Sequence, residues 1–230
     1  MNTSSKNKIE PFVVKDCSLI TLSTGQRAIN LRELCERIAH CSLESIDYHF
    51  FATKLRPAFD DPEYPNDFAA WVSYVLHDRS LAERLGMINP FEYQDSEGLR
   101  QETLNVVEDH LSLTQHIPWT TPEHEFIFLR SQMALFETGR RISRPEDFAT
   151  LAPHLSTGSV YYHFVEARRR IDDSRDDFSV WLDAFGDGYA NLKEALSRVD
   201  YYFCSLSELK DRISLVFQNA FGKKEGIVSR

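Results

Sequence analysis

The chain has 230 residues, 42% of them hydrophobic, and its 26 Lys and Arg against 35 Asp and Glu give a formal net charge of −9. A chain of this length and composition can bury a core of its own. Its acidic balance argues against nucleic acid or an anionic membrane as the main partner.

The cysteines and the first residues bear on the cellular location. Cys17, Cys35, Cys41 and Cys204 have neither the spacing of a disulfide framework nor that of a zinc site, which is typical of reduced, buried thiols. The first residues lack the apolar stretch of a signal peptide, and no run of residues is apolar enough to span a membrane. We therefore expect a cytoplasmic protein without a membrane partner.

The first predicted elements are a strand and a helix. Residues 11–23, PFVVKDCSLITLS, are rich in β-branched and aromatic residues, and we expect this strand to stop at Gly25, which tolerates backbone angles that other residues resist. Residues 30–41 predict a helix with Asn30 as its N-cap. The apolar residues of this helix share one face: Leu31, Leu34, Ile38 and Cys41.

The second half of the chain repeats this order of elements. Residues 125–137, EFIFLRSQMALFE, predict a strand that ends at Gly139. A helix follows, with Ser143 as its cap and Pro145 in its first turn, where proline is favoured. Polar residues and prolines at about 113–125 indicate a linker between the two halves.

The sequence aligned with itself explains this likeness. Residues 12–56 align with residues 126–170 without a gap, and eleven of the aligned pairs are identical. Self-similarity at a fixed offset is typical of a repeated structural unit. We therefore predict a mainly α fold with minor β structure, in which two tandem homologous repeats, 1–113 and 114–230, pack as one pseudo-twofold unit.

The similar segments SIDYHF, 45–50, and SVYYHF, 159–164, contain the candidate ligand-binding residues. Residues four and seven apart share a face of a helix, so each segment and a following arginine form a Ser-His-Arg stripe. Such a stripe can bind phosphate or carboxylate, and the tyrosines could line the same cleft. The candidates are Ser45, Tyr48, His49, Arg56, Ser159, Tyr162, His163 and Arg170.

A structural interpretation of the same residues stays open. The histidines would then be hydrogen-bonded core residues, and the arginines would pair with aspartates that open the next helix. Other residues that recur in both halves are candidates for ion pairs, helix starts and core anchors. They are Arg27, Asp67, Trp71, Arg141, Asp177 and Trp181.

Other motifs give no metal site, cofactor or nucleophile. His40 and His154 also recur, but nine residues separate each from the next histidine, which would place each pair on opposite faces of one helix. The chain has no G-x-S-x-G motif and no glycine-rich phosphate loop. The basic run 168–170 is followed by several aspartates, a pattern typical of a solvated helix face.

Several strings along the chain are specific enough to indicate a protein family: PFVVKDC, SIDYHF with LRPAFDDPEYPNDFAAW, GSVYYHF with DDFSVWL, and SLSELKDRI. Through these strings nearly the whole chain resembles a family of uncharacterised bacterial proteins known only as a domain of unknown function. The resemblance implies a bacterial cytosolic protein. It implies no activity, substrate or catalytic residue.

Two functions follow as alternatives. The missing catalytic motifs favour a non-enzymatic binding protein, regulatory or scaffold in role, whose partner is another protein or a small anionic ligand. The second alternative is an enzyme acting on an anionic small molecule, with His49 or His163 as acid–base and Arg56 or Arg170 holding the anion. The enzyme requires these side chains to line an open pocket. No oligomeric state follows from the sequence.

Overall fold

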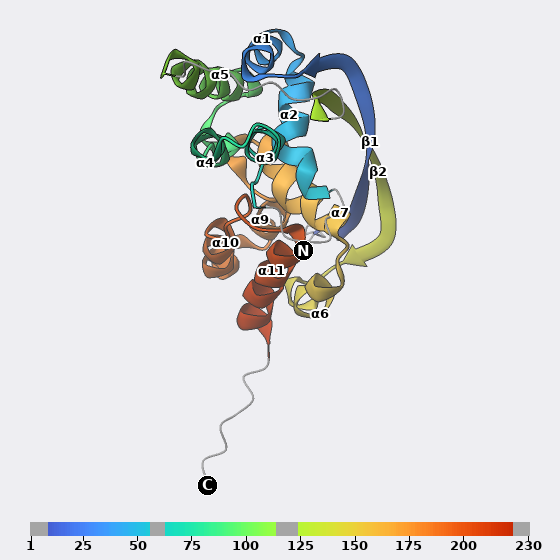
Figure 1. Cartoon of the computed structure of the whole chain (residues 1–230). Coiled ribbons are helices and arrows are strands. Elements are labelled where there is room, and N and C mark those ends of the chain that lie inside the picture. Colours follow the sequence, from blue (N-terminus) through green and yellow to red (C-terminus); the bar gives the residue numbers. More distant parts are fainter. Residues whose placement is uncertain (1–8, 56–62, 114–123, 223–230) are drawn as a thin grey trace, which may run out of the picture. The chain divides into compact units, whose positions relative to one another are not determined.

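The computed structural model describes residues 9–55, 63–113 and 124–222 (Figure 1). The chain divides into two compact units. Unit 2 consists of Leu19–Ala134. Unit 1 is discontinuous in sequence, because Met1–Ser18 joins the C-terminal part of the chain.

The strands are β1 (Phe12–Ala28) and β2 (Phe126–Ile142), which form a two-stranded antiparallel sheet. Thr138 Oγ1 donates to the carbonyl of Val14 in unit 1, and Thr24 Oγ1 donates to the carbonyl of Phe128 in unit 2, both at 2.7 Å. The strand residues divide between the units as follows: 12–18 and 135–142 in unit 1, 19–28 and 126–134 in unit 2.

Both strands are longer than the sequence predicted. They continue through Gly25 and Gly139, each with a φ of 77°, instead of stopping there. Glycine adopts this positive φ without steric cost, so a strand can pass through the position with a local distortion of the kind seen in β-bulges. The glycines therefore bend the strands and do not end them.

The described helices of unit 2 include one whose start the sequence predicted. Asn30 is the N-cap of α1, and its side chain accepts the N–H of Glu33 at 2.9 Å. The predicted apolar face of this helix is buried, which confirms that prediction. The helices are α1 (Leu31–His40), α2 (Leu43–Phe51), α3 (Asp67–Tyr74), α4 (Arg79–Gly86) and α5 (Ser96–Leu113), with 3₁₀ turns at Ala52–Leu55 and Pro90–Glu92.

Most described helices of unit 1 are shorter than those of unit 2. The first helical segment of unit 1 also begins at a different residue from the predicted one. Arg144, not Ser143, precedes the first turn, and Pro145 opens a 3₁₀ turn. The helices are α6 (Phe148–Leu151), α7 (Thr157–Val160), α8 (Ala167–Arg170), α9 (Asp177–Asp183), α10 (Ala190–Ser197) and α11 (Leu206–Phe221). A π-helical turn covers Tyr161–Glu166, and 3₁₀ turns cover Pro145–Asp147, Ala152–His154, Asp172–Ser174 and Gly186–Tyr189.

The strand and helices of unit 1 meet closely at Gly158, in α7. A Cβ at this position would lie 2.5 Å from the carbonyl oxygen of Cys17 and 2.2 Å from Oδ1 of Asp16, both in β1. Only glycine allows such an approach. Next to it, Phe12 of β1 stacks on Phe178 of α9 with ring centroids 5.3 Å apart. The N-terminal strand segment is therefore part of the core of unit 1.

The predicted fold class is wrong. The sheet is a major packing element and not minor β structure, because buried residues from both strands contribute to the cores. The compact units also do not correspond to two tandem repeats, because unit 1 combines segments from both ends of the sequence. The predicted boundary between 1–113 and 114–230 is not the boundary between the units, because unit 1 includes the strand residues 12–18.

A helix that spans a bilayer needs about 20 consecutive, predominantly apolar residues. Across residues 9–55, 63–113 and 124–222, every helix is too short or too polar to serve as a transmembrane span.

Candidate functional site

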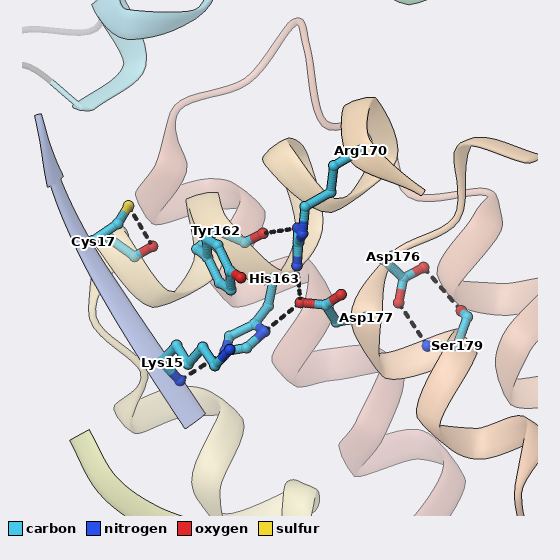
Figure 2. A network of polar contacts seen from close by, with 9 residues as sticks. Lys15, Cys17, Tyr162, His163, Arg170, Asp176, Asp177 and Ser179 are labelled. Atoms are coloured by element: carbon cyan, nitrogen blue, oxygen red, sulfur yellow. Dashed lines mark hydrogen bonds and ion pairs between the residues drawn. The ribbon is translucent and has the colours of Figure 1, made fainter. Parts of the chain in front are cut away.

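His163 is the centre of a polar network in unit 1 (Figure 2). It lies in the π-helical turn, and the residue is 2% exposed. Its Nδ1 lies 2.7 Å from Oδ2 of Asp177, in the first turn of α9. Its Nε2 lies 2.9 Å from the backbone nitrogen of Lys15, in β1. One side chain thus joins a strand and two helical segments.

The backbone partner fixes the form of the His163 ring. The N–H of Lys15 can only donate, so Nε2 must be the unprotonated acceptor. The ring proton then sits on Nδ1 and is donated to the carboxylate of Asp177. Both ring nitrogens are therefore engaged with protein groups, and neither is directed at solvent.

His49 of α2 has the same set of partners in unit 2. Nδ1 lies 2.8 Å from Oδ2 of Asp67, and Nε2 accepts the backbone N–H of Leu129, in β2, at 3.0 Å. The residue is 1% exposed. Ser45 donates its hydroxyl to the carbonyl of Leu129 at 2.7 Å. Both backbone groups of one strand residue are thus bound by side chains of α2.

The other candidate residues are also held by neighbouring protein groups. Ser159 is 1% exposed and its hydroxyl accepts from that of Ser156 at 3.0 Å, while the hydroxyl of Tyr48 lies 3.4 Å from that of Thr21. Arg170 donates to Asp177 and to the carbonyl of Tyr162. Its guanidinium lies 4.2 Å from the Tyr162 ring centroid. Arg56 lies outside the described residues.

Residues of the predicted stripes therefore form hydrogen bonds with backbone groups of the strands. The buried serines and histidines bind strand or helix groups. Of the stripe in unit 1, Arg170 and Tyr162 are the members with partly exposed side chains. The contacts match the structural interpretation of these residues more closely than the ligand-binding one.

The remaining recurring residues have structural contacts. Asp67 and Asp177 are the first residues of their helices, whereas the side chains that cap these helices belong to Asn66 and Asp176. The indole N–H of Trp71 donates to the backbone carbonyl of His124 at 2.7 Å, and that of Trp181 donates to the backbone carbonyl of Glu10 at 2.8 Å. Arg27 pairs with Glu125, and Arg141 pairs with Glu137 on the surface.

Sequence reasoning missed the most deeply buried ion pair of unit 1. Arg168 and Asp176 have side chains 6% and 2% exposed, with Nη2 of the arginine 3.2 Å from Oδ2 of the aspartate. The guanidinium lies between the rings of Phe164 and Tyr201, 4.4 and 4.6 Å from their centroids. Burial raises the pKa of Asp176, and the charge of Arg168 opposes that rise. The basic run is thus not solvated throughout.

The cysteines differ in burial. Cys17 and Cys41 are buried, whereas Cys35 and Cys204 are partly exposed, so the prediction of four buried thiols holds for two. Burial raises the pKa of Cys17 to about 12, and nearby Asp16 adds to the rise. Burial also raises the pKa of Cys41 to about 11. Among the described residues, no three His, Cys, Asp or Glu side chains are grouped to hold a metal ion.

The raised thiol pKa values predict selective labelling. At pH 8, a pKa of about 12 leaves about one Cys17 thiol in ten thousand as the reactive thiolate, and burial blocks access to it. We expect a thiol reagent to modify Cys35 and Cys204 in the native protein, and Cys17 and Cys41 only after unfolding. Mass mapping of labelled peptides measures this. Rapid native labelling of Cys17 in wild type would contradict it, and Cys17→Ser is the control for peptide assignment.

The comparisons with known proteins give a family and one solved neighbour. The model of a family of unknown function (DUF5752) matches residues 9–218. The structure of OrfY from Thermoproteus tenax is similar, with a TM-score of 0.72 and 31% sequence identity over 91% of this chain and 95% of that chain. No curated protein matches the chain. Bacterial origin stays a prediction.

Proposed function

The chain belongs to the family of unknown function DUF5752, and we propose that it is a non-enzymatic protein-binding module with a regulatory or scaffold role. The proposal rests on one observation: His49 and His163, the candidate acid–base residues, both have structural hydrogen bonds. Each ring has one nitrogen on a carboxylate and the other on a strand N–H. A histidine whose nitrogens are both occupied has no free site for proton exchange with a substrate.

The sheet of unit 2 supports a binding role. The segment 126–134 lies against α2, which binds the N–H and carbonyl of Leu129. The segment 19–28 is therefore the outer strand of this unit, and it exposes Ile20 and Leu22 by 52% and 38%. Apolar side chains on an outer strand are costly in water and are a common feature of strands that bind another protein segment.

A test of this binding role replaces the exposed apolar side chains of Ile20 and Leu22 by charged ones. Purified protein and the variant Ile20→Asp/Leu22→Asp would be used to capture partners from extracts of the source cells. A captured polypeptide would then be purified and titrated against both proteins by calorimetry. We expect the variant to bind at least about tenfold more weakly, which corresponds to about 1.4 kcal/mol.

A matched control is available on a helix end in the same unit. Met87 is 75% exposed, and Met87→Asp should leave the affinity within about twofold. A partner that binds wild type and the strand variant equally would contradict the proposed surface. A small-molecule mass bound to native protein and absent from Arg170→Met would instead favour the anion-binding alternative.

A further inference from the structure

The sheet of unit 1 has one covered edge. The segment 12–18 of β1 is its inner strand, because Phe12, Val14 and Cys17 are buried and the N–H of Lys15 donates to His163. A helical side chain thus binds the edge of β1 that faces away from β2. A covering helix is one way in which proteins prevent an edge strand from pairing with other chains.

The outer strand of this unit is the segment 135–142 of β2. Within the part of the chain that the structure describes, its only strand neighbour is β1, so its second edge has no strand partner. Its residues are exposed from Leu135 to Arg141, and Ile142 is half-buried. Leu135 and Phe136 are 44% and 51% exposed although they are large and apolar. Two consecutive residues of a strand point to opposite faces, so both faces expose apolar surface at this end.

The order of charges along this segment is self-complementary. Glu137 lies two residues before Gly139, and Arg140 and Arg141 follow this glycine. Two residues opposite each other in an antiparallel pair point to the same face, so two identical copies align about a single residue. Alignment about Gly139 places Glu137 of each copy opposite Arg141 of the other. The same alignment places the apolar Phe136 opposite Ile142. Opposite charges and apolar pairs across neighbouring strands are favourable, whereas like charges are unfavourable.

We propose that a second copy of the chain binds here, through antiparallel pairing of the two 135–142 segments about a twofold axis. A symmetric dimer requires a surface that complements itself, which this charge order provides. A uniformly acidic or basic strand from another protein would match one end of the segment and be repelled at the other. The acid–base order therefore favours the chain's own copy over a partner of one charge sign.

The charged groups of the segment have only weak contacts within the chain: Arg140 Nη1 donates to the carbonyl of His154 at 3.5 Å, the longest distance for a hydrogen bond. Arg141 and Glu137 form a pair at 3.3 Å within the strand, but their side chains are 58% and 57% exposed. An exposed pair of this kind contributes little stability, so exchanging it for contacts across a dimer has a small cost. The inference goes beyond the proposed function, because it concerns purified protein alone and a different strand from Ile20 and Leu22.

A charge-reversal experiment tests the dimer. The variants are Glu137→Arg and Arg140→Glu/Arg141→Glu, and the measurement is sedimentation equilibrium with light scattering of the full-length protein. Each variant alone places like charges opposite each other. We expect wild type to form a dimer and each variant to dissociate about tenfold or more readily. A mixture of the two variants restores opposite charges at both ends and should form a heterodimer.

The control changes a similar surface pair elsewhere in the unit. Glu194 of α10 pairs with Arg198, and both side chains are more than half exposed. Glu194→Arg should leave the dimer unchanged. A wild type that stays monomeric at all concentrations, or variants that fail to recombine while retaining native circular dichroism, would overturn the proposal. Either result leaves the partner-capture experiment on unit 2 unaffected.

Discussion

Replacing His163 by alanine is expected to lower the free energy of unfolding by about 3 kcal/mol, a large fraction of the stability of a typical domain. The loss has two sources. The ring packs against Phe12 and Phe178, with centroids 4.8 and 5.8 Å away, so its removal leaves a cavity in the core. The backbone N–H of Lys15 also loses its acceptor, and an unsatisfied buried donor costs about 1–3 kcal/mol.

Urea unfolding of the full chain measures the overall loss, and amide exchange identifies its origin. The amide of Lys15 should exchange faster in His163→Ala, because its acceptor is gone. In wild type, NMR of the imidazole nitrogens should show the neutral ring with its proton on Nδ1. These two readouts test the proposed contact itself, which a general loss of stability would not.

Two variants make the comparison specific. His163→Gln keeps both a donor and an acceptor on the side chain and should recover part of the lost stability. His154→Ala removes an exposed histidine of the same unit and should change the stability by less than about 0.5 kcal/mol. If His163→Ala cost no more than His154→Ala, the histidine would not be the link between β1 and the helices. His49→Ala tests the corresponding contact in unit 2.

Local features of the fold were predictable from the sequence, and long-range ones were not. The cap at Asn30 and the buried face that contains Leu34 and Ile38 follow from spacing within one helix. By contrast, His163 and its strand partner Lys15 are 148 residues apart. Periodicity shows that a strand has a buried face but not which helices cover it, so the exchange of strand segments between the units could not be predicted.

The candidate stripe shows the same limit. Spacing placed a serine and a histidine on one helix face, and the structure brings both to a strand. Exposure to a ligand and burial against a backbone amide require the same residue types at the same spacing. The choice between them depends on the strand, which lies elsewhere in the chain. The hydrogen-bonding capacity of the stripe was therefore predictable, but its partner was not.

Arg168 shows how a local pattern can mislead. A run of three arginines followed by aspartates is typical of a solvated face, yet this arginine is buried between Phe164 and Tyr201. The second ring comes from a segment more than thirty residues later in the sequence. Its carboxylate partner is Asp176, a pairing that the sequence analysis did not propose. The pairing of Arg170 with Asp177 that the structural interpretation expected is present, and the buried pair lies next to it in the sequence.

Replacing Arg168 by methionine is expected to destabilise the protein by about 3–5 kcal/mol at neutral pH, because Asp176 is left as a buried charge without its counter-ion. The arginine also donates to the carbonyls of Ser174 and Leu196 at 3.0 and 3.3 Å, and these bonds are lost as well. The double variant Arg168→Met/Asp176→Asn should lose less than the sum of the single losses. Asparagine can still cap α9, so this variant removes the charge and keeps the cap.

The matched control is an exposed pair in the same unit. Arg175 donates to Asp183 at 2.6 Å, and both side chains are about two-fifths exposed. Arg175→Met should cost less than about 1 kcal/mol, because water screens both charges. The contrast between the two arginines separates the effect of burial from that of losing an arginine.

The pH dependence of Arg168→Met has a definite sign. Burial already raises the pKa of Asp176 above its ordinary value of 3.8, and removing Arg168 removes a charge that lowers it. A raised pKa in the folded protein means that the contribution of this group to stability is fully present below the unfolded pKa and is lost as pH rises through the folded pKa. The deficit of Arg168→Met relative to wild type should therefore shrink when urea unfolding is repeated near pH 4. A deficit equal at both pH values would show that lost packing and hydrogen bonds, and not the unpaired carboxylate, account for the destabilisation.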